Sequence, residues 1–116
     1  YIQRARRSDA KVALEQVRAA QEMWRAERGS YATDGGGATA EVKLQNTMGV
    51  PATISIFYTW NFTVKTATLF TAQAVPTGSQ TSDSGGTLFI NENGVKWSVK
   101  DGKTYTYPDP YCGWSK

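Results

Sequence analysis

The sequence contains no histidine and a single cysteine, Cys112. Without histidine, the chain lacks the commonest general base and the commonest metal ligand. One cysteine cannot close a disulfide within the chain, so cysteine content does not identify the compartment. The remaining residues show no nucleophile paired with a base and no dense group of metal ligands. We therefore expect no enzyme activity, no catalytic residues, no metal and no other cofactor.

Long apolar runs are missing as well, since none reaches the ~18 residues that suggest a transmembrane helix. Arginine is absent after Arg28, and residues 1–28 carry seven basic and four acidic side chains. The net charge of +3 therefore belongs to this first segment, because residues 29–116 hold six lysines and six acidic residues. A neutral main body argues against a nucleic-acid partner, whose binding requires a basic surface.

Residues 1–28 contain neither proline nor glycine and predict one α-helix. Apolar residues recur in steps of three and four, which gives the helix a face for packing. A seam of residues seven apart follows this face and continues beyond the helix, and we predict that it forms the helix–sheet core: Ala10, Val17, Trp24 and Tyr31. The helix should extend about 42 Å, long enough to project from a small domain.

The remainder of the chain predicts antiparallel strands. The clearest runs from Ile54 to Val64, where apolar residues stand at every second position. Leu69–Val75 and a later hairpin complete four strands, and residues 103–107 offer a short edge strand. The fold class is therefore α+β, with the long helix packed on a four-stranded antiparallel sheet. We expect a single domain made of these parts: the helix at 1–28, a loop at 29–53 with an ambiguous helical turn at 41–49, the sheet at 54–107 and a tail at 108–116.

This order of elements resembles the type IV pilins and their minor-pilin relatives. Three local patterns carry the resemblance: the helix opening Arg6-Arg7-Ser8-Asp9-Ala10-Lys11 with its continuation to Trp24, the step Glu27-Arg28-Gly29-Ser30-Tyr31-Ala32, and the later order from Tyr58 through Phe70 and Gly86-Thr87 to Cys112-Gly113-Trp114. The patterns span nearly the whole chain, and their order and spacing carry more weight than any single one.

The resemblance implies a structural subunit of a pilus-like filament, with roles in adhesion, motility or DNA uptake. Such subunits sit in the inner membrane through an apolar half-helix, with this domain in the periplasm, before they join a surface pilus. Residues 1–28 would be the second half of that helix. The implied partners are other pilin subunits, the assembly machinery and the inner membrane. The residues encoded before Tyr1 test this expectation, since a basic leader and about 20 apolar residues should precede it.

Two sets of residues are candidate sites under this resemblance. The basic residues at the start of the helix are expected to contact lipid headgroups or a neighbouring subunit, with a solvated helix face as the alternative: Arg4, Arg6, Arg7 and Lys11. Cys112 matches the late partner of a disulfide found in many pilins, but glycine stands at 85 and 86, where its mate often lies. It is left unpaired, and a buried small side chain is the simplest interpretation.

Two other interpretations remain open. A pseudopilin of a type II secretion system shares the fold and the assembly logic. A binding module for DNA or glycans is a different class, for which the stripe Tyr58, Trp60 and Phe62 offers stacking surfaces. The strict period of two in this stripe favours the core of the sheet instead. A DNA-binding module would reveal itself by an affinity that falls steeply as salt rises.

Overall fold

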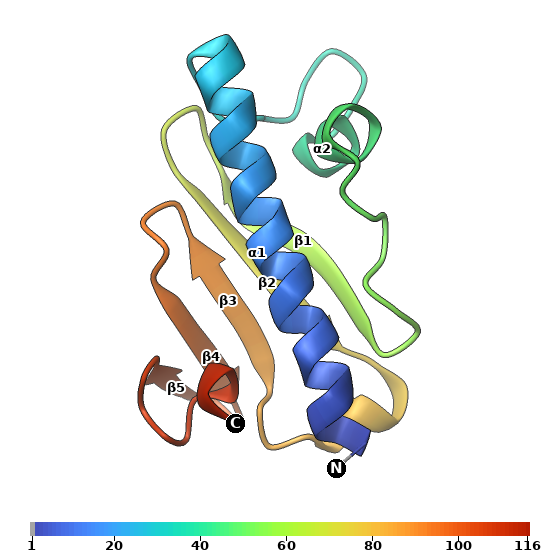
Figure 1. The fold of residues 1–116 in the computed structure, drawn as a ribbon, viewed down its shortest axis with the longest axis vertical. Coiled ribbons are helices and arrows are strands. Elements are labelled where there is room, and N and C mark those ends of the chain that lie inside the picture. Colours follow the sequence, from blue (N-terminus) through green and yellow to red (C-terminus); the bar gives the residue numbers. More distant parts are fainter. Residues whose placement is uncertain (1) are drawn as a thin grey trace.

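The computed structural model describes residues 2–116, so Tyr1, the first residue of the predicted helix, lies outside the described part. A long helix, α1 (Ile2–Arg28), crosses one face of an antiparallel sheet whose strands follow one another in chain order (Figure 1). The strands are β1 (Tyr58–Lys65), β2 (Phe70–Pro76), β3 (Thr87–Asn91), β4 (Lys96–Lys100) and β5 (Lys103–Thr106). The α+β class and the helix-on-sheet layout are confirmed, and the fifth strand occupies the predicted edge position.

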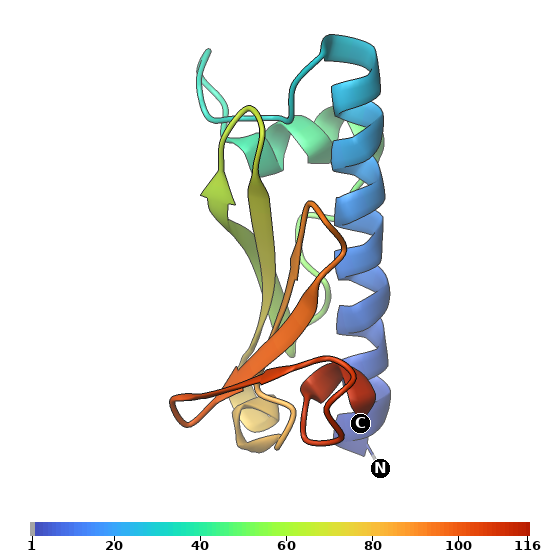
Figure 2. The ribbon, with the colours of Figure 1, turned by 90° about the vertical axis from the view of Figure 1, so that its left-hand side faces the viewer.

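The core lies between α1 and the sheet, which form two layers when the molecule is seen from the side (Figure 2). Ala10, Val17 and Tyr31 are buried in this core, while Trp24 is only partly buried and packs against it. From the sheet side come the aromatic residues of β1 and β2, including Tyr58, Trp60, Phe62 and Phe70. The Tyr31 and Phe70 rings meet edge to face with centroids 4.9 Å apart. The aromatic stripe of β1 is therefore occupied by packing and offers no surface for stacking a sugar.

Strand β1 starts later than the alternation predicted. It begins at Tyr58, opposite Pro76, the last residue of β2. The Phe57 N–H donates to the Ser55 hydroxyl within its own segment and not to β2, so the ladder stops and the backbone before Tyr58 leaves the sheet. Ile56, expected on the buried face, is instead 83% exposed. The alternation of apolar residues alone could not show at which residue β1 begins.

The helical turn that the sequence left ambiguous at 41–49 is a second helix, α2 (Ala40–Met48), within the predicted loop. The Thr39 hydroxyl accepts the Val42 N–H at its start, and Gly49, with a φ of +72°, ends it in the left-handed region. Glu41 accepts a hydrogen bond from the N–H of Phe62 and pairs with Lys65 at 2.9 Å. Helix α2 thereby covers the outer edge of β1.

The tail packs onto the sheet through a short helical turn, η2 (Gly113–Ser115). The Trp114 indole N–H donates to the carbonyl oxygens of Phe89 and Trp97, at 3.0 and 3.1 Å. Cys112 is fully buried with a free thiol. A Cβ atom added to Gly113 would lie 2.4 Å from the Gly85 carbonyl oxygen, so the tail is seated against the segment where many pilins carry the second cysteine. Close glycine packing holds the two segments together here.

Candidate functional site

Helix α1 has a second apolar face that points away from the sheet. Its members recur in steps of three, four or seven, which keeps them on one side of the helix, and all are exposed: Ile2, Ala5, Val12, Ala19, Met23 and Ala26. Small residues on a helix surface let another helix approach closely. No part of the described chain, residues 2–116, covers this face. It is the surface through which the helix can meet a neighbour.

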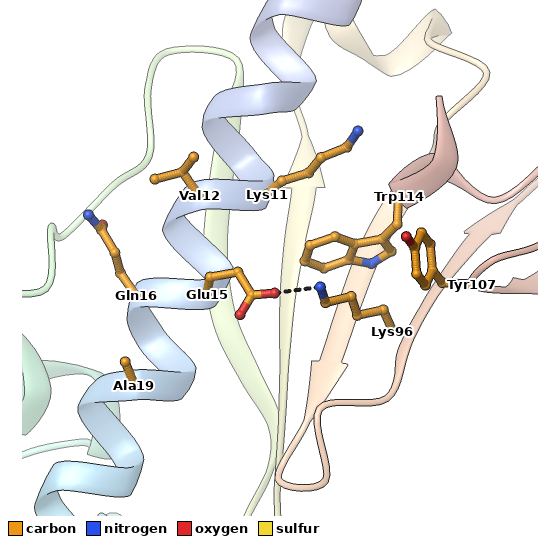
Figure 3. A pocket seen from close by; sticks show the side chains of 8 residues that line it. All are labelled: Lys11, Val12, Glu15, Gln16, Ala19, Lys96, Tyr107 and Trp114. Carbon is orange, nitrogen blue, oxygen red and sulfur yellow. Dashed lines mark ion pairs between the residues drawn. The ribbon is translucent and has the colours of Figure 1, made fainter.

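A groove of about 500 Å³ runs beside this face, between α1 and the C-terminal strands. Figure 3 shows Val12 and Ala19 on its helix side and the rings of Tyr107 and Trp114 on the other. Lys96 pairs with Glu15 across it at 2.6 Å. The lining is mainly apolar. We call this hollow the α1–β4 groove.

The basic residues predicted at the start of the helix have different surroundings. Arg4 is exposed, whereas the Arg6 guanidinium lies 3.5 Å over the Phe57 ring and donates to the Ser79 hydroxyl. The Lys11 ammonium donates to the Lys116 carbonyl oxygen at 2.8 Å. Burial, together with the nearby positive charges of Arg7 and Arg4, lowers the pKa of Lys11. A contact of Arg4, Arg6 or Lys11 with lipid or a neighbouring subunit stays a prediction.

Arg7 differs from these residues because its side chain turns inward. It makes two hydrogen bonds of 2.8 Å to the carboxylate of Asp83, and both residues are buried. Burial alone would raise the pKa of the Asp83 carboxyl, but the hydrogen bonds and charge of Arg7 outweigh it and hold the pKa below its usual range. This ion pair fixes the start of α1 to the turn after η1 (Gly78–Ser82). Arg7 is therefore not available to headgroups or to another subunit.

A second cluster of cations, which the sequence analysis did not single out, lies at the turn between β4 and β5. Its groove, of about 270 Å³, is lined by three lysines, two tyrosines, a serine and one aspartate: Lys100, Lys103, Lys116, Tyr105, Tyr111, Ser84 and Asp101. Tyr111 is 67% exposed, and its ring centroid lies 6.1 Å from that of Tyr105. We call this the lysine–tyrosine groove.

The lysines of this groove make no ion pair among residues 2–116. Lys100 donates to the Thr81 carbonyl oxygen and Lys116 to the Ser84 hydroxyl, both of them neutral acceptors. Elsewhere, Lys65 meets Asp34 and Glu41, and Lys96 meets Glu15. Positive charge that is uncompensated within the protein is free to attract an anion. The lysine–tyrosine groove is thus a place where a polyanion can bind.

The fold defines the class of protein. The structure matches a high-resolution structure of a type IV pilin from Shewanella oneidensis with a TM-score of 0.60 and 25% sequence identity, over 89% of this chain and 99% of that chain. The match confirms the predicted resemblance to type IV pilins. No curated protein matches the chain.

A family model narrows the class. Residues 1–89 match the family described as "Type IV minor pilin ComP, DNA uptake sequence receptor", and the chain belongs to this family. It is therefore a structural subunit of a type IV pilus, made to assemble with other pilin subunits, and its fold is structural and not enzymatic. None of the helices within residues 2–116 is long and apolar enough to span a bilayer.

Proposed function

We propose that this subunit is a minor pilin that binds DNA during DNA uptake, and that the lysine–tyrosine groove contacts the phosphate backbone. The observation that carries the proposal is the grouping of three lysines, none in an ion pair within residues 2–116, beside two tyrosines and a single aspartate. Lysine side chains neutralise phosphates, and tyrosine hydroxyls donate to phosphate oxygens. The description of the family, as a receptor for DNA uptake sequences, supports DNA binding by the subunit, and the matched residues end before the lysines of the groove.

The charge balance of the main body argued against this partner. That inference summed charges over residues 29–116, where basic and acidic side chains cancel. The last 21 residues, from Lys96 to Lys116, hold four lysines against two aspartates. Binding depends on the local field at a surface and not on the total, so a neutral body is compatible with a basic groove.

Each lysine that neutralises a phosphate makes the slope of the logarithm of affinity against the logarithm of salt concentration more negative by about 0.9. Three lysines predict a slope of about −2.7, which is an affinity loss of about 40-fold between 50 and 200 mM salt. Fluorescence anisotropy with a labelled DNA duplex in a salt series measures this slope.

The variant to test is the triple change Lys100→Gln, Lys103→Gln and Lys116→Gln. It should remove most of the affinity and bring the slope close to zero, while the protein stays folded by circular dichroism. A matched control, Lys43→Gln with Lys65→Gln, removes lysines from the α2 side of the molecule. The DNA proposal is wrong if the triple variant binds as tightly as the control.

In the pilus, we place the outer face of α1 against neighbouring subunits. Ala19 lies at the centre of that face and is exposed, so Ala19→Glu should leave the fold intact and exclude the subunit from filaments. The matched control is Gln16→Glu, which adds the same charge one turn earlier in place of a side chain that is already polar. Immunoblots of sheared pili distinguish the two variants.

The proposed location of the subunit in the cell follows from its membership of the type IV pilins. We place the subunit in the inner membrane before assembly, with the described domain in the periplasm, and in the pilus afterwards. Adhesion and motility remain further roles for such a pilus. The type II secretion pseudopilin shares the fold, but the family match favours the pilus.

A further inference from the structure

The segment that contains η1 is bonded to the start of α1. We call residues 78–86 the η1 segment. Four side chains, two glutamines and two arginines, join it to the first two turns of the helix with hydrogen bonds of 2.8 to 3.0 Å: Gln3 to Ser82, Arg6 to Ser79, Arg7 to Asp83, and Gln80 to the Gln3 carbonyl oxygen. The position of the η1 segment therefore depends on where the helix begins its course across the sheet.

The same segment also holds two lysines of the lysine–tyrosine groove. The Thr81 carbonyl oxygen accepts a hydrogen bond from the Lys100 ammonium at 2.8 Å, and the Ser84 hydroxyl accepts one from the Lys116 ammonium at 2.9 Å. Ser84 is itself part of the groove lining. Two of the three groove lysines thus take their positions from acceptors on the η1 segment.

The η1 segment is hydrogen-bonded within itself. The Asp83 N–H donates to the Gln80 carbonyl oxygen at 3.0 Å, and the Gly86 N–H donates to the Asp83 carbonyl oxygen at 3.2 Å. The Thr81 hydroxyl donates to the Gly78 carbonyl oxygen at 2.8 Å. At the two ends, Gly78 and Gly86 have φ angles of +58° and +65°, in the left-handed region that glycine adopts without strain. Because the internal bonds resist bending, a displacement of the contacts with α1 also moves the acceptors of the lysines.

Gln80 is the most enclosed of these contacts. Its side chain is fully buried, and its amide donates to the Gln3 carbonyl oxygen and, at 3.1 Å, to the Tyr58 hydroxyl. One neutral side chain therefore ties the η1 segment to both α1 and β1. Since it lies beneath the surface and has no charge, it can affect DNA binding only by changing where other groups stand.

We propose that Gln80 is a positioning residue for DNA binding, and that the η1 segment links the seating of the start of α1 to Lys100 and Lys116. The inference rests on the DNA role proposed for the lysine–tyrosine groove. The affinity for DNA then depends on whether the first turns of α1 are bonded to the η1 segment. A neighbouring subunit that draws the start of α1 away from this segment would lower the DNA affinity.

The substitution Gln80→Met tests the link, because it keeps a similar volume, changes no charge and removes both hydrogen bonds of the side chain. The matched control is Gln21→Met, since Gln21 is also fully buried and its hydrogen bonds go to the Ala32 backbone. We expect similar losses of stability in urea unfolding. Only Gln80→Met should weaken the binding of a labelled DNA duplex, measured by anisotropy.

The salt series gives a readout that lower stability alone would not move. If two lysines lose their positions, the slope should change from about −2.7 toward about −0.9, the value for Lys103 alone. The loss of affinity between 50 and 200 mM salt would then fall from about 40-fold toward about 3.5-fold. In Gln21→Met the slope should stay at the wild-type value.

A milder variant keeps the test open if Gln80→Met does not fold. Gln3 is half-buried, and Gln3→Ala removes the hydrogen bond from its amide to the Ser82 hydroxyl. It should weaken DNA binding in the same direction but less. Gln16→Ala is its control, because Gln16 is an exposed glutamine of the same helix.

Amide chemical shifts of the ¹⁵N-labelled variants without DNA separate this inference from the DNA proposal. The amides of Lys100 and Lys116 should move in Gln80→Met and stay in place in Gln21→Met. The inference is overturned if these two amides stay in place in Gln80→Met, or if both variants bind DNA equally well. Absence of DNA binding by the wild-type protein would overturn the DNA proposal, whereas displaced amides would still establish the link between α1 and the two lysines.

Discussion

Two groups of cations in this subunit have opposite surroundings. Arg7 and Lys65 lie within hydrogen-bonding distance of carboxylates, Asp83 and Glu41, and join elements that are far apart in the sequence. The lysines of the lysine–tyrosine groove meet only neutral acceptors. Paired cations hold the fold together, whereas unpaired cations remain available to a ligand. The total charge of +3 conveys nothing of this division.

The largest effect should follow from breaking the buried pair. Asp83→Ala leaves Arg7 as an uncompensated buried charge, which typically costs about 3–5 kcal/mol. Urea unfolding of the variant measures the loss in the free energy of unfolding. Asp9→Ala is the matched control, since it removes an exposed carboxylate without an ion pair and should change stability little. Equal stabilities for the two variants would contradict the assignment of Arg7 to the fold.

A second change disturbs the packing of the tail, which carries Tyr111 and Lys116, without removing a charge. In Gly113→Ala the new Cβ would meet the Gly85 carbonyl oxygen, 2.4 Å away, and a methyl group of Leu88. Overpacking of this kind costs about 1–3 kcal/mol. The tail that carries Tyr111 and Lys116 should loosen, which weakens DNA binding as well. Ser115→Ala is the control, and thermal unfolding with DNA anisotropy is the measurement. Wild-type values for both in Gly113→Ala would show that the tail is not seated here.

The buried pair also predicts a pH dependence. The folded-state pKa of Asp83 is lowered, so its contribution to stability is full above the unfolded pKa of about 3.9 and is lost as pH falls through the folded pKa. The difference in stability between wild type and Asp83→Asn should therefore be largest near neutral pH and shrink below about pH 4. Urea unfolding across this range measures it. A difference that stays constant with pH would contradict the lowered pKa.

Two single substitutions with small expected effects separate the paired cations from the unpaired lysines. Lys65→Gln should lower stability by about 1 kcal/mol or less, because its ion pairs are partly exposed, and should leave DNA affinity unchanged. Lys103→Gln should do the reverse, with unchanged stability and weaker DNA binding. Unfolding and anisotropy on the same two proteins test both statements. The division fails if both variants change the same property.

Sequence periodicity predicted much of this fold and little of its charged contacts. The seam through Ala10 and Val17 follows from helical spacing, and the long helix on an antiparallel sheet follows from it. Local patterns could not place the pair of Arg7 and Asp83, whose members stand 76 residues apart and meet only after folding.

The start of strand β1 and the lysine–tyrosine groove could not be predicted from the periodicity of apolar residues. The start of β1 depended on the local hydrogen bond between the Ser55 hydroxyl and the Phe57 N–H, and not on the alternation around Ile56. The groove was missed because charge was summed over 88 residues, although a shorter window from Lys96 onward shows the excess of lysine. Its arrangement still required the β4–β5 turn and the tail to come together in three dimensions.

The most direct test of the central claim is a map of amide chemical shifts of the ¹⁵N-labelled chain during titration with a DNA duplex. We predict that the shifts concentrate at Lys100, Lys103 and Tyr111, while the amides of Glu41 and Lys65 stay in place. Shifts around Lys65, or along the arginines of α1 with none in the lysine–tyrosine groove, would contradict the claim that unpaired cations form the DNA surface.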